Sequence, residues 1–475
     1  MKIGRTALSS TLALALVACG SDSTSPPPVF GTPTPTPPTT GCAVSEQINF
    51  ANAVLDEWYL FPNLLASNVS TTGYSDVQSY LDARVAPARA QGIDRGFTYA
   101  TSIAEENALI NSGSTAGFGI RLGYDTANNR VFVLEAYESA NGYAAGIDRG
   151  TELIAIGTTA STLQTVSSLM ASGGPQAVSN ALGPSEAGVS RVLRFVPAGG
   201  STVERTVTKS DFSLDPVSDR YGAVVLNDGG KKVGYLNLRT FIVEDAEQQL
   251  RNAFGTFKSE GITELVIDLR YNGGGLVRVA DTFGDLMGAG RVGQVWSQTV
   301  LRASKSSENS TELFQTEANA IQPTKVAFIG RGGTASASEL VINSMLPYLG
   351  NNVALIGDDT FGKPVGQYGF DLASCDLRIR AVTFQTNNAS GNGSYYNGLA
   401  EVVPNTCRAA DDIFTQFGDP SEASIAAALD FLGGRTCAAP ITAVPGQRTT
   451  QSVNTRELLQ PERPTAAQYE IPGLF

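Results

Sequence analysis

The 475-residue sequence contains no histidine, and that absence excludes several kinds of active site. A Ser-His-Asp triad, a Cys-His pair, a histidine zinc site and a histidine proton shuttle are all ruled out. The sequence also lacks G-x-S-x-G, S-x-x-K and C-x-x-C motifs, which disfavours the corresponding hydrolases and a redox or metal role for its cysteines. We therefore expect neither a metal nor an organic cofactor.

Basic segments are scarce as well. The net charge is −12 and no Lys/Arg-rich run occurs, so a nucleic-acid partner is disfavoured, because binding to phosphate groups needs a basic face. Hydrophobic residues make up 42% of the chain, which is ordinary for a globular protein, and the length suffices for two to four domains.

The first residues have the features of an export signal. Lys2 and Arg5 precede the apolar run ALSSTLALALVA, which spans only ~18 Å as a helix and is too short for a hydrocarbon core of ~30 Å. The run ends in LVAC, which resembles the bacterial lipobox and implies cleavage before Cys19 and acylation of its thiol. An ordinary signal with an unrelated cysteine is the alternative.

A Pro/Thr/Ser-rich segment follows Cys19 and is predicted to be an extended tether, because its composition cannot pack a core. Signal, lipid and tether together predict a protein anchored to the lipid bilayer of a bacterial cell envelope and facing the periplasm. Gly20, directly after the cysteine, favours the outer membrane.

Four further cysteines, Cys42, Cys375, Cys407 and Cys437, form an even set in an exported chain, which predicts disulfide bonds. Three pairings are possible, and the sequence alone does not choose among them. We favour Cys375 with Cys407, which flank one segment. Cys42 would then pair with Cys437, since these two lie near the ends of the folded body.

Three patterns divide the folded body. Helical spacing of apolar residues, as in EQINFANAVLDEWYLFP, predicts a small helical domain at its start. Short β-rich runs separated by turns follow from about residue 114 to 209. From about residue 221 to 434, continuous apolar strands such as ITELVIDLR alternate with helices such as EDAEQQLRNAFGTFKSEG. This last pattern predicts a largely parallel sheet covered on both faces.

The β-rich segment contains GFGI, then AAGIDRGTELIAI, in an order that resembles a PDZ domain. The resemblance implies that the backbone N–H groups of Gly117, Phe118, Gly119 and Ile120 receive a peptide carboxylate, while the next strand accepts the peptide by β-augmentation. Thr151 stands where the family usually has an aspartate. A small β domain that only packs on its neighbours is the alternative.

Three loops of the α/β segment follow strands at the edge where open α/β sheets usually bind ligands. They are DLRYNGGGL (268–276), TASASE (334–339) and DDTFGKPVGQ (358–367). Successive glycines expose backbone N–H groups that can hold an oxyanion, although a tight turn explains them equally well.

Ser336 and Lys363 carry the chemistry that these loops allow. A serine before a helix N-terminus is exposed where developing negative charge is favoured, but a structural N-cap serine is the alternative. A lysine acts as a base only when neutral, which requires an apolar pocket that lowers its pKa by about three units from ~10.4. Otherwise Lys363 is an ordinary surface lysine.

In this order, the three motifs resemble the C-terminal processing, or tail-specific, proteases over about residues 114–412. The resemblance implies Ser336 as the nucleophile, with Ser338 as its near neighbour, Lys363 as the base, and Gln367 as the residue that orients the lysine. It further implies an oxyanion hole. The backbone N–H groups for that hole would come from Ala337 and from one glycine of the loop, for which we favour Gly274.

Two departures from the family pattern occur in the lysine loop. Pro364 replaces the usual glycine after Lys363, and the interval between serine and lysine is slightly longer than usual. The fold that the resemblance implies is multidomain α+β, with an α/β protease core of the ClpP/crotonase-like type. The predicted segments are 1–18 (signal peptide), 19–41 (tether), 42–112 (helical domain), 113–210 (PDZ-like domain), 211–435 (catalytic domain) and 436–475 (polar, flexible tail).

The resemblance implies a serine endopeptidase that cleaves periplasmic proteins and recognises apolar substrate C-termini. A catalytically silent, lipid-anchored PDZ module is the main alternative, and an acyl-thioester-binding relative of the crotonases is a weaker one. The chain itself ends in EIPGLF, an apolar C-terminus of the kind PDZ grooves bind. Occupation of the groove by Phe475 is therefore a hypothesis for autoinhibition.

Overall fold

The computed structural model describes residues 42–437, 439–441 and 456–475. The predicted signal peptide, the tether and Cys19 lie outside the described residues. Within the described ranges, no helix is both long and apolar enough to cross a membrane.

A six-stranded sheet forms the centre of the C-terminal half, in the order β10-β11-β12-β15-β16-β19. All neighbours in it are parallel except β10 and β11, which form an antiparallel pair. The strands are β10 (Ala223–Asp228), β11 (Lys231–Asn237), β12 (Glu264–Asp268), β15 (Lys325–Gly330), β16 (Val353–Gly357) and β19 (Asn405–Arg408).

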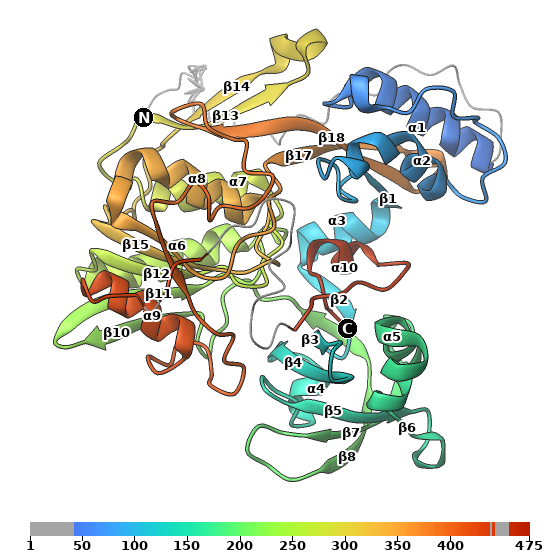
Figure 1. Ribbon diagram of the computed structural model, residues 1–475, viewed down its shortest axis with the longest axis horizontal. Coiled ribbons are helices and arrows are strands. Elements are labelled where there is room, and N and C mark those ends of the chain that lie inside the picture. The colour runs from blue at the N-terminus through green and yellow to red at the C-terminus, as the bar shows by residue number, and fades with distance from the viewer. Residues whose placement is uncertain (1–41, 438, 442–455) are drawn as a thin grey trace, which may run out of the picture. The chain divides into compact units, whose positions relative to one another are not determined.

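Helices cover both faces of this sheet (Figure 1). They are α6 (Ala246–Ser259), α7 (Val277–Leu286) and α8 (Ala337–Leu349) on one face and α9 (Ala423–Leu432) on the other. In β12, Leu265 and Ile267 pack toward the first three helices, whereas Val266 packs toward α9. Burial on both faces explains the continuous apolar strands, and the prediction of a largely parallel, covered sheet is confirmed.

A second sheet joins the N-terminal region to the C-terminal half, in the order β1-β18-β13-β14, with β17 also paired to β18. Its strands are β1 (Tyr99–Ser102), β13 (Val295–Leu301), β14 (Ser310–Leu313), β17 (Val365–Leu372) and β18 (Leu377–Asn388). The predicted N-terminal helices are α1 (Val44–Trp58), α2 (Val77–Ala90) and α3 (Ile103–Ser112). They do not stand apart, because Trp58 of α1 packs on Phe370 of β17 with ring centroids 5.6 Å apart.

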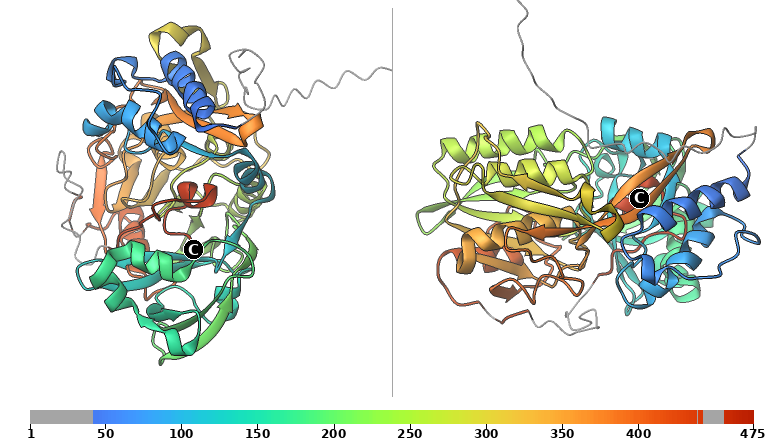
Figure 2. Two further views of the ribbon diagram at one scale, coloured as in Figure 1. Left: turned by 90° about the vertical axis from the view of Figure 1, so that its right-hand side faces the viewer. Right: turned by 90° about the horizontal axis from the view of Figure 1, so that it is seen from above.

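The middle domain, residues 114–213, is a twisted β-sheet with one long helix (Figure 2). Its strands run in the order β3-β4-β5-β7-β8, and β6 pairs with β5. Its elements are β3 (Ile120–Asp125), β4 (Arg130–Ala136), α4 (Asn141–Ala144), β5 (Glu152–Gly157), β6 (Gln164–Thr165), α5 (Val166–Leu182), β7 (Ser190–Val196) and β8 (Val203–Thr208). The antiparallel strands β2 (Ser114–Gly117) and β9 (Ser210–Ser213) lead into and out of it.

Short 3₁₀ helices complete the connections. They are η1 (Pro62–Leu64), η2 (Ala160–Thr162), η3 (Ala303–Glu308), η4 (Gly350–Asn352) and η5 (Ala373–Cys375).

The end of the chain differs from the predicted flexible tail. Residues 456–475 contain α10 (Ala466–Glu470), and a turn after it leads to a bridge between Leu474 and Arg121 of β3. Ile471, Leu474 and Phe475 are buried, with exposed fractions of 0%, 3% and 3%. The prediction failed because the polar, Pro-rich composition was averaged over the whole segment, whereas a few apolar residues at its end find a preformed apolar surface.

The favoured disulfide pairing is wrong. The structure joins Cys42 to Cys375 and Cys407 to Cys437. Cys375 lies in η5, in the turn of the β17–β18 hairpin against which the N-terminal helices pack, and so it meets Cys42. Cys407 lies on β19 in the other sheet, near the chain that leaves α9, and so it meets Cys437.

A buried ion pair fixes the loop that follows β12. Arg270 donates to both carboxylate oxygens of Glu422 at 2.9 and 2.8 Å and to Asp268 at 2.9 Å. All three side chains are at most 1% exposed. Glu422 also caps α9 through the backbone N–H groups of Ser424 and Ile425, so this cluster joins the glycine-rich loop to α9.

We expect Arg270→Met to lower the free energy of unfolding by ~3–5 kcal/mol, because Asp268 and Glu422 would remain buried without a partner. Urea denaturation followed by circular dichroism measures the change. The control is Arg194→Met, which removes an exposed pair with Glu204 and should cost at most ~1 kcal/mol. Equal shifts in the two variants would contradict this account of the cluster.

Candidate active site

Ser336 lies at the turn between β15 and α8 in an unusual backbone conformation. Its φ is 55° and its ψ is −117°, which costs a residue with a Cβ on the order of 1–3 kcal/mol. A serine that serves only as an N-cap has an extended conformation instead. The side chain is partly exposed, whereas that of Ser338 is fully buried and donates from its Oγ to the Asn272 carbonyl at 3.0 Å. Of the two serines, Ser336 is the accessible one.

Glu339 joins the serine turn to the lysine loop. Its carboxylate accepts the backbone N–H of Ser336 at 3.1 Å and that of Lys363 at 2.7 Å. It also accepts the N–H of Gly362 at 2.7 Å and the hydroxyl of Thr360 at 2.6 Å. Complete burial raises the pKa of Glu339 to about 7, and the four donated hydrogen bonds oppose that rise. Through this one carboxylate the structure brings the predicted nucleophile and the predicted base together.

Lys363 lies on the loop between β16 and β17 and is partly exposed. Its Nζ lies 5.0 Å from the centroid of the Phe97 ring. Burial lowers the pKa of Lys363 below its ordinary value, as the predicted role of a base requires. The carboxylates around it oppose that shift, and the largest of these opposing effects comes from Glu470.

Gln367 contacts the residue beneath the lysine. Its Nε2 donates to the Phe97 carbonyl at 2.6 Å, and the Phe97 ring faces Lys363. Gln367 therefore supports the lysine through Phe97. Pro364, the departure from the family pattern, accepts the N–H of Thr386 at its carbonyl at 3.0 Å, just before β17 begins to pair with β18.

The glycine-rich loop lies directly against the serine turn. Gly274 has φ 105°, and a Cβ at this position would lie 2.7 Å from the Ser336 Cβ and 2.9 Å from the Ala337 nitrogen. The two predicted oxyanion donors thus come from segments that touch each other. The Gly274 N–H, however, donates to the Asn272 side chain at 2.9 Å, so this structure shows it with a partner.

Tyr271, at the start of the same loop, ties it to distant parts of the chain. It has φ 66°, and its hydroxyl donates to the carboxylate of Asp411 at 2.6 Å. Burial raises the pKa of Asp411, but the guanidinium groups of Arg331 and Arg149 outweigh this and hold it well below its usual range. Arg149 belongs to the middle domain and also donates to the Tyr271 hydroxyl at 3.3 Å.

The predicted peptide-binding residues lie around the end of the chain itself. The N–H of Ile120 donates to the Phe475 carbonyl at 3.1 Å, and the Phe475 N–H donates to the Ile120 carbonyl at 2.9 Å. A Cβ on Gly117 would lie 2.9 Å from the Phe475 carbonyl carbon. Gly119 has φ 71° beside Ala140, and the fully buried Phe118 shares an apolar cluster with Phe475.

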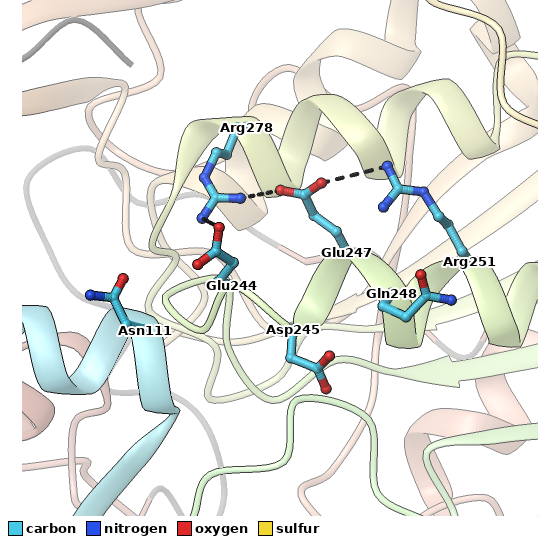
Figure 3. A pocket seen from close by; sticks show the side chains of 7 residues that line it. All are labelled: Asn111, Glu244, Asp245, Glu247, Gln248, Arg251 and Arg278. Carbon is cyan, nitrogen blue, oxygen red and sulfur yellow. Dashed lines mark hydrogen bonds and ion pairs between the residues drawn. The ribbon is translucent and has the colours of Figure 1, made fainter. Parts of the chain in front are cut away.

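A separate polar cavity of about 380 Å³ lies beside α6 and α7 (Figure 3). Its lining residues are Asn111, Glu244, Asp245, Glu247, Gln248, Arg251 and Arg278. Arg278 pairs with Glu244 and Glu247, and Arg251 also pairs with Glu247. Because both arginines are paired and none of the motif residues lines the cavity, the candidate site is the serine turn with the lysine loop. Among the described residues, no group of three metal-ligating side chains occurs.

Residues 232–401 match the model of peptidase family S41. This segment contains Ser336, Ala337, Lys363, Gln367 and Gly274. The middle domain and the N-terminal helices lie outside the matched segment.

Curated relatives extend the similarity. The carboxyl-terminal-processing protease of Synechocystis is 23% identical over 353 residues, covering 73% of this chain and 75% of its own. The chloroplastic carboxyl-terminal-processing peptidase 2 of Arabidopsis thaliana is 27% identical over 284 residues, covering 58% of this chain and 50% of its own.

A Bacteroides fragilis protein of known crystal structure, which its name assigns to the S41 proteases, shares the fold. Its TM-score is 0.63 at 21% identity, covering 84% of this chain and 99% of the other. The sequence similarity to S41 peptidases thus lies in residues 232–401, and the structural likeness shows a mixed α/β fold like that of the Bacteroides fragilis protein.

Sequence reasoning missed several residues of this site. Glu339 was used only to locate Ser336, although a glutamate three residues after a serine at a helix start is a recognised capping pattern. Tyr271, Asp411 and Arg149 carry no local signal, because they meet only through the tertiary fold. Glu470 lies in the segment that was predicted to be a flexible tail.

We expect Gly274→Ala to lower the free energy of unfolding by ~1–3 kcal/mol, because the new Cβ would press on Ser336 and the residue would keep a positive φ. Thermal or urea denaturation measures the loss. Gly332→Ala is the matched control on the neighbouring loop, since a Cβ there meets nothing within 4 Å. A Gly274 variant as stable as this control would show that the close approach is absent.

Proposed function

We propose that the chain is a serine endopeptidase of the C-terminal processing type, with Ser336 as nucleophile and Lys363 as base. The observation that carries this proposal is the Glu339 carboxylate, which binds the backbone N–H groups of both residues. A structural cap would need only the bond to its own helix, so the second bond to the lysine loop supports a shared catalytic site. Retention of Gln367 beside them argues against a catalytically silent module.

In the proposed reaction, neutral Lys363 takes the proton of the Ser336 hydroxyl while Oγ attacks the carbonyl carbon of a peptide bond. The C–N bond then breaks, and the lysine ammonium returns the proton to the leaving amine. Water, activated by the same lysine, hydrolyses the acyl-enzyme and frees Ser336.

The negative oxygen of each tetrahedral intermediate is held by backbone N–H groups, and losing one such donor typically costs ~10²–10³ in rate. Ala337 supplies one donor from the start of α8. Gly274 supplies the second after its N–H releases the Asn272 side chain, which is its partner in this structure. Substrate binding therefore includes a small rearrangement of the glycine-rich loop.

The middle domain is proposed to act as a PDZ-like domain that selects substrates by an apolar C-terminus, through the backbone of residues 117–120 and the edge of β3. The ClpP/crotonase-like type of the catalytic core stays a prediction. Acylation of Cys19, attachment to the outer membrane and periplasmic protein substrates are likewise proposals, and they rest on the N-terminal sequence alone.

We expect the purified full-length protein to cleave an unfolded protein with an apolar C-terminus, and Ser336→Ala and Lys363→Ala each to abolish cleavage. Gel electrophoresis and mass spectrometry of the products give the readout. Ser338→Ala is the control: its hydroxyl is buried, so cleavage should persist. Equal cleavage by the wild type and both site variants would exclude this site.

The pH dependence follows from the base. Only neutral Lys363 accepts a proton, so kcat/KM should rise with pH through the pKa of the lysine and level off above it. Because burial lowers that pKa, the midpoint should lie below ~10.4, the ordinary lysine value. Lys363→Arg stays protonated and should be inactive throughout. A kcat/KM that decreases with rising pH over this range would contradict a lysine base.

A further inference from the structure

The last described segment, residues 456–475, touches both the middle domain and the catalytic loops. At its start, Glu457 pairs with Tyr124 of β3 through two backbone hydrogen bonds of 2.9 Å. Leu458 follows and lies against Gly333 and Tyr271, since its Cδ1 would be 2.6 Å from a Cβ on Gly333. The chain then forms α10 and returns to β3 (Figure 1).

The final residues pair with the edge of β3 through an antiparallel bridge between Leu474 and Arg121. The Leu122 N–H donates to the Gly473 carbonyl at 2.7 Å, and Ile120 exchanges two backbone hydrogen bonds with Phe475. The Phe475 side chain lies in the apolar core of the domain with Phe118 and Val178. This is the geometry of a bound peptide C-terminus in β-augmentation, and here the occupant is the chain itself.

The segment also lies against the glycine-rich loop of the proposed catalytic site. The Glu470 carbonyl oxygen would lie 2.8 Å from a Cβ on Gly273, in the loop that touches Ser336. Tyr99 donates to the Glu470 carboxylate at 2.9 Å, and its ring stacks on that of Tyr469 with centroids 4.1 Å apart. The backbone of Glu470 thus lies against the glycine-rich loop, and its side chain is held by Tyr99.

The charge of Glu470 acts on the proposed base. The groups that face Lys363 are the carboxylates of Glu470, Asp94 and Glu339, which favour its protonated form, and the guanidinium of Arg380, which opposes it. Asp94 and Glu339 are parts of the folded body and stay in place. Glu470 alone of these belongs to the tail, so release of the tail removes the largest carboxylate effect that favours the protonated lysine.

We propose that residues 456–475 are a built-in competitive inhibitor that occupies the peptide groove with Phe475 and the catalytic site with Glu470. A substrate with an apolar C-terminus displaces Phe475 first, and this frees the site. Because a tethered segment has an effective concentration on the order of millimolar, only a well-matched or locally concentrated substrate C-terminus competes. This inference rests on the proposed function for its effect on cleavage, but occupation of the groove can be tested without catalysis.

The binding test uses the full-length chain with Ser336→Ala and a fluorescent peptide with the sequence of residues 470–475. Without its own last six residues, the protein should bind the peptide at least about tenfold more tightly than with them, as measured by fluorescence anisotropy. Phe475→Asp, which keeps the tail but loses its apolar anchor, should bind like the shortened chain. Glu462→Ala changes an exposed side chain of the same segment and should bind like the intact tail. Equal binding by the shortened and the intact chains would overturn the proposal whatever the activity.

The activity test uses the same tails with Ser336 restored. Deletion of residues 470–475 and Phe475→Asp should each raise kcat/KM at least about tenfold, and the free hexapeptide should inhibit the shortened chain again. Glu470→Gln should move the rising limb of the pH profile to lower pH, a shift that a merely structural role would not produce. Unchanged kcat/KM in the shortened chain would overturn the inhibition.

The two proposals fail in different ways. If the shortened chain binds the peptide more tightly but no variant cleaves any substrate, the tail does occupy the groove and the proposed peptidase activity is rejected. Mass spectrometry could also show that the wild type loses its last residues while Ser336→Ala keeps them. The tail would then be a substrate, and its role as a stable inhibitor would be overturned.

Discussion

The proposed serine–lysine site draws on two separate segments, and one buried carboxylate holds both of them in place. Glu339 accepts the backbone N–H groups of Ser336 and Lys363, so it fixes both main chains at the positions from which these two side chains extend. Because all four hydrogen bonds to Glu339 are donated to it, the carboxylate fills its acceptor sites without any help from water. Most other features of the site can be understood as supports for this junction.

A second set of contacts relates the middle domain to the same junction. Arg149 of that domain donates to the Tyr271 hydroxyl, and Arg239 of the catalytic part donates to Glu135 and Glu138 of the middle domain at 3.0 and 2.9 Å. These arginines are fully or almost fully buried, so separation of the two parts would expose or strand several charges. The middle domain is therefore joined to the glycine-rich loop and to the rest of the catalytic part by buried polar contacts. The tail makes a further connection, because both of its ends pair with β3 while Glu470, between them, lies against Gly273.

The central sheet and its helices could be predicted from the sequence because their signals are local: apolar strands buried on both faces and helices of clear periodicity. The order of the β-rich runs in the middle domain was equally readable. Contacts between distant segments could not be predicted from the sequence. The pairing of β1 with β18 and the two disulfides depend on which surfaces meet, and no single stretch of sequence records that. For the tail, composition indicated a lack of structure, whereas three apolar side chains at its end were enough to bury it.

The Cys42–Cys375 disulfide has a mechanical consequence. It fastens the beginning of the described chain to the turn of the β17–β18 hairpin, whose strand β17 carries Gln367. Tension applied to the chain at Cys42 is therefore transmitted by a covalent bond to the second sheet, and it does not pass through α1. A pull on that end therefore acts first on the turn that joins β17 to β18, and it reaches the loop of Lys363 only through β17.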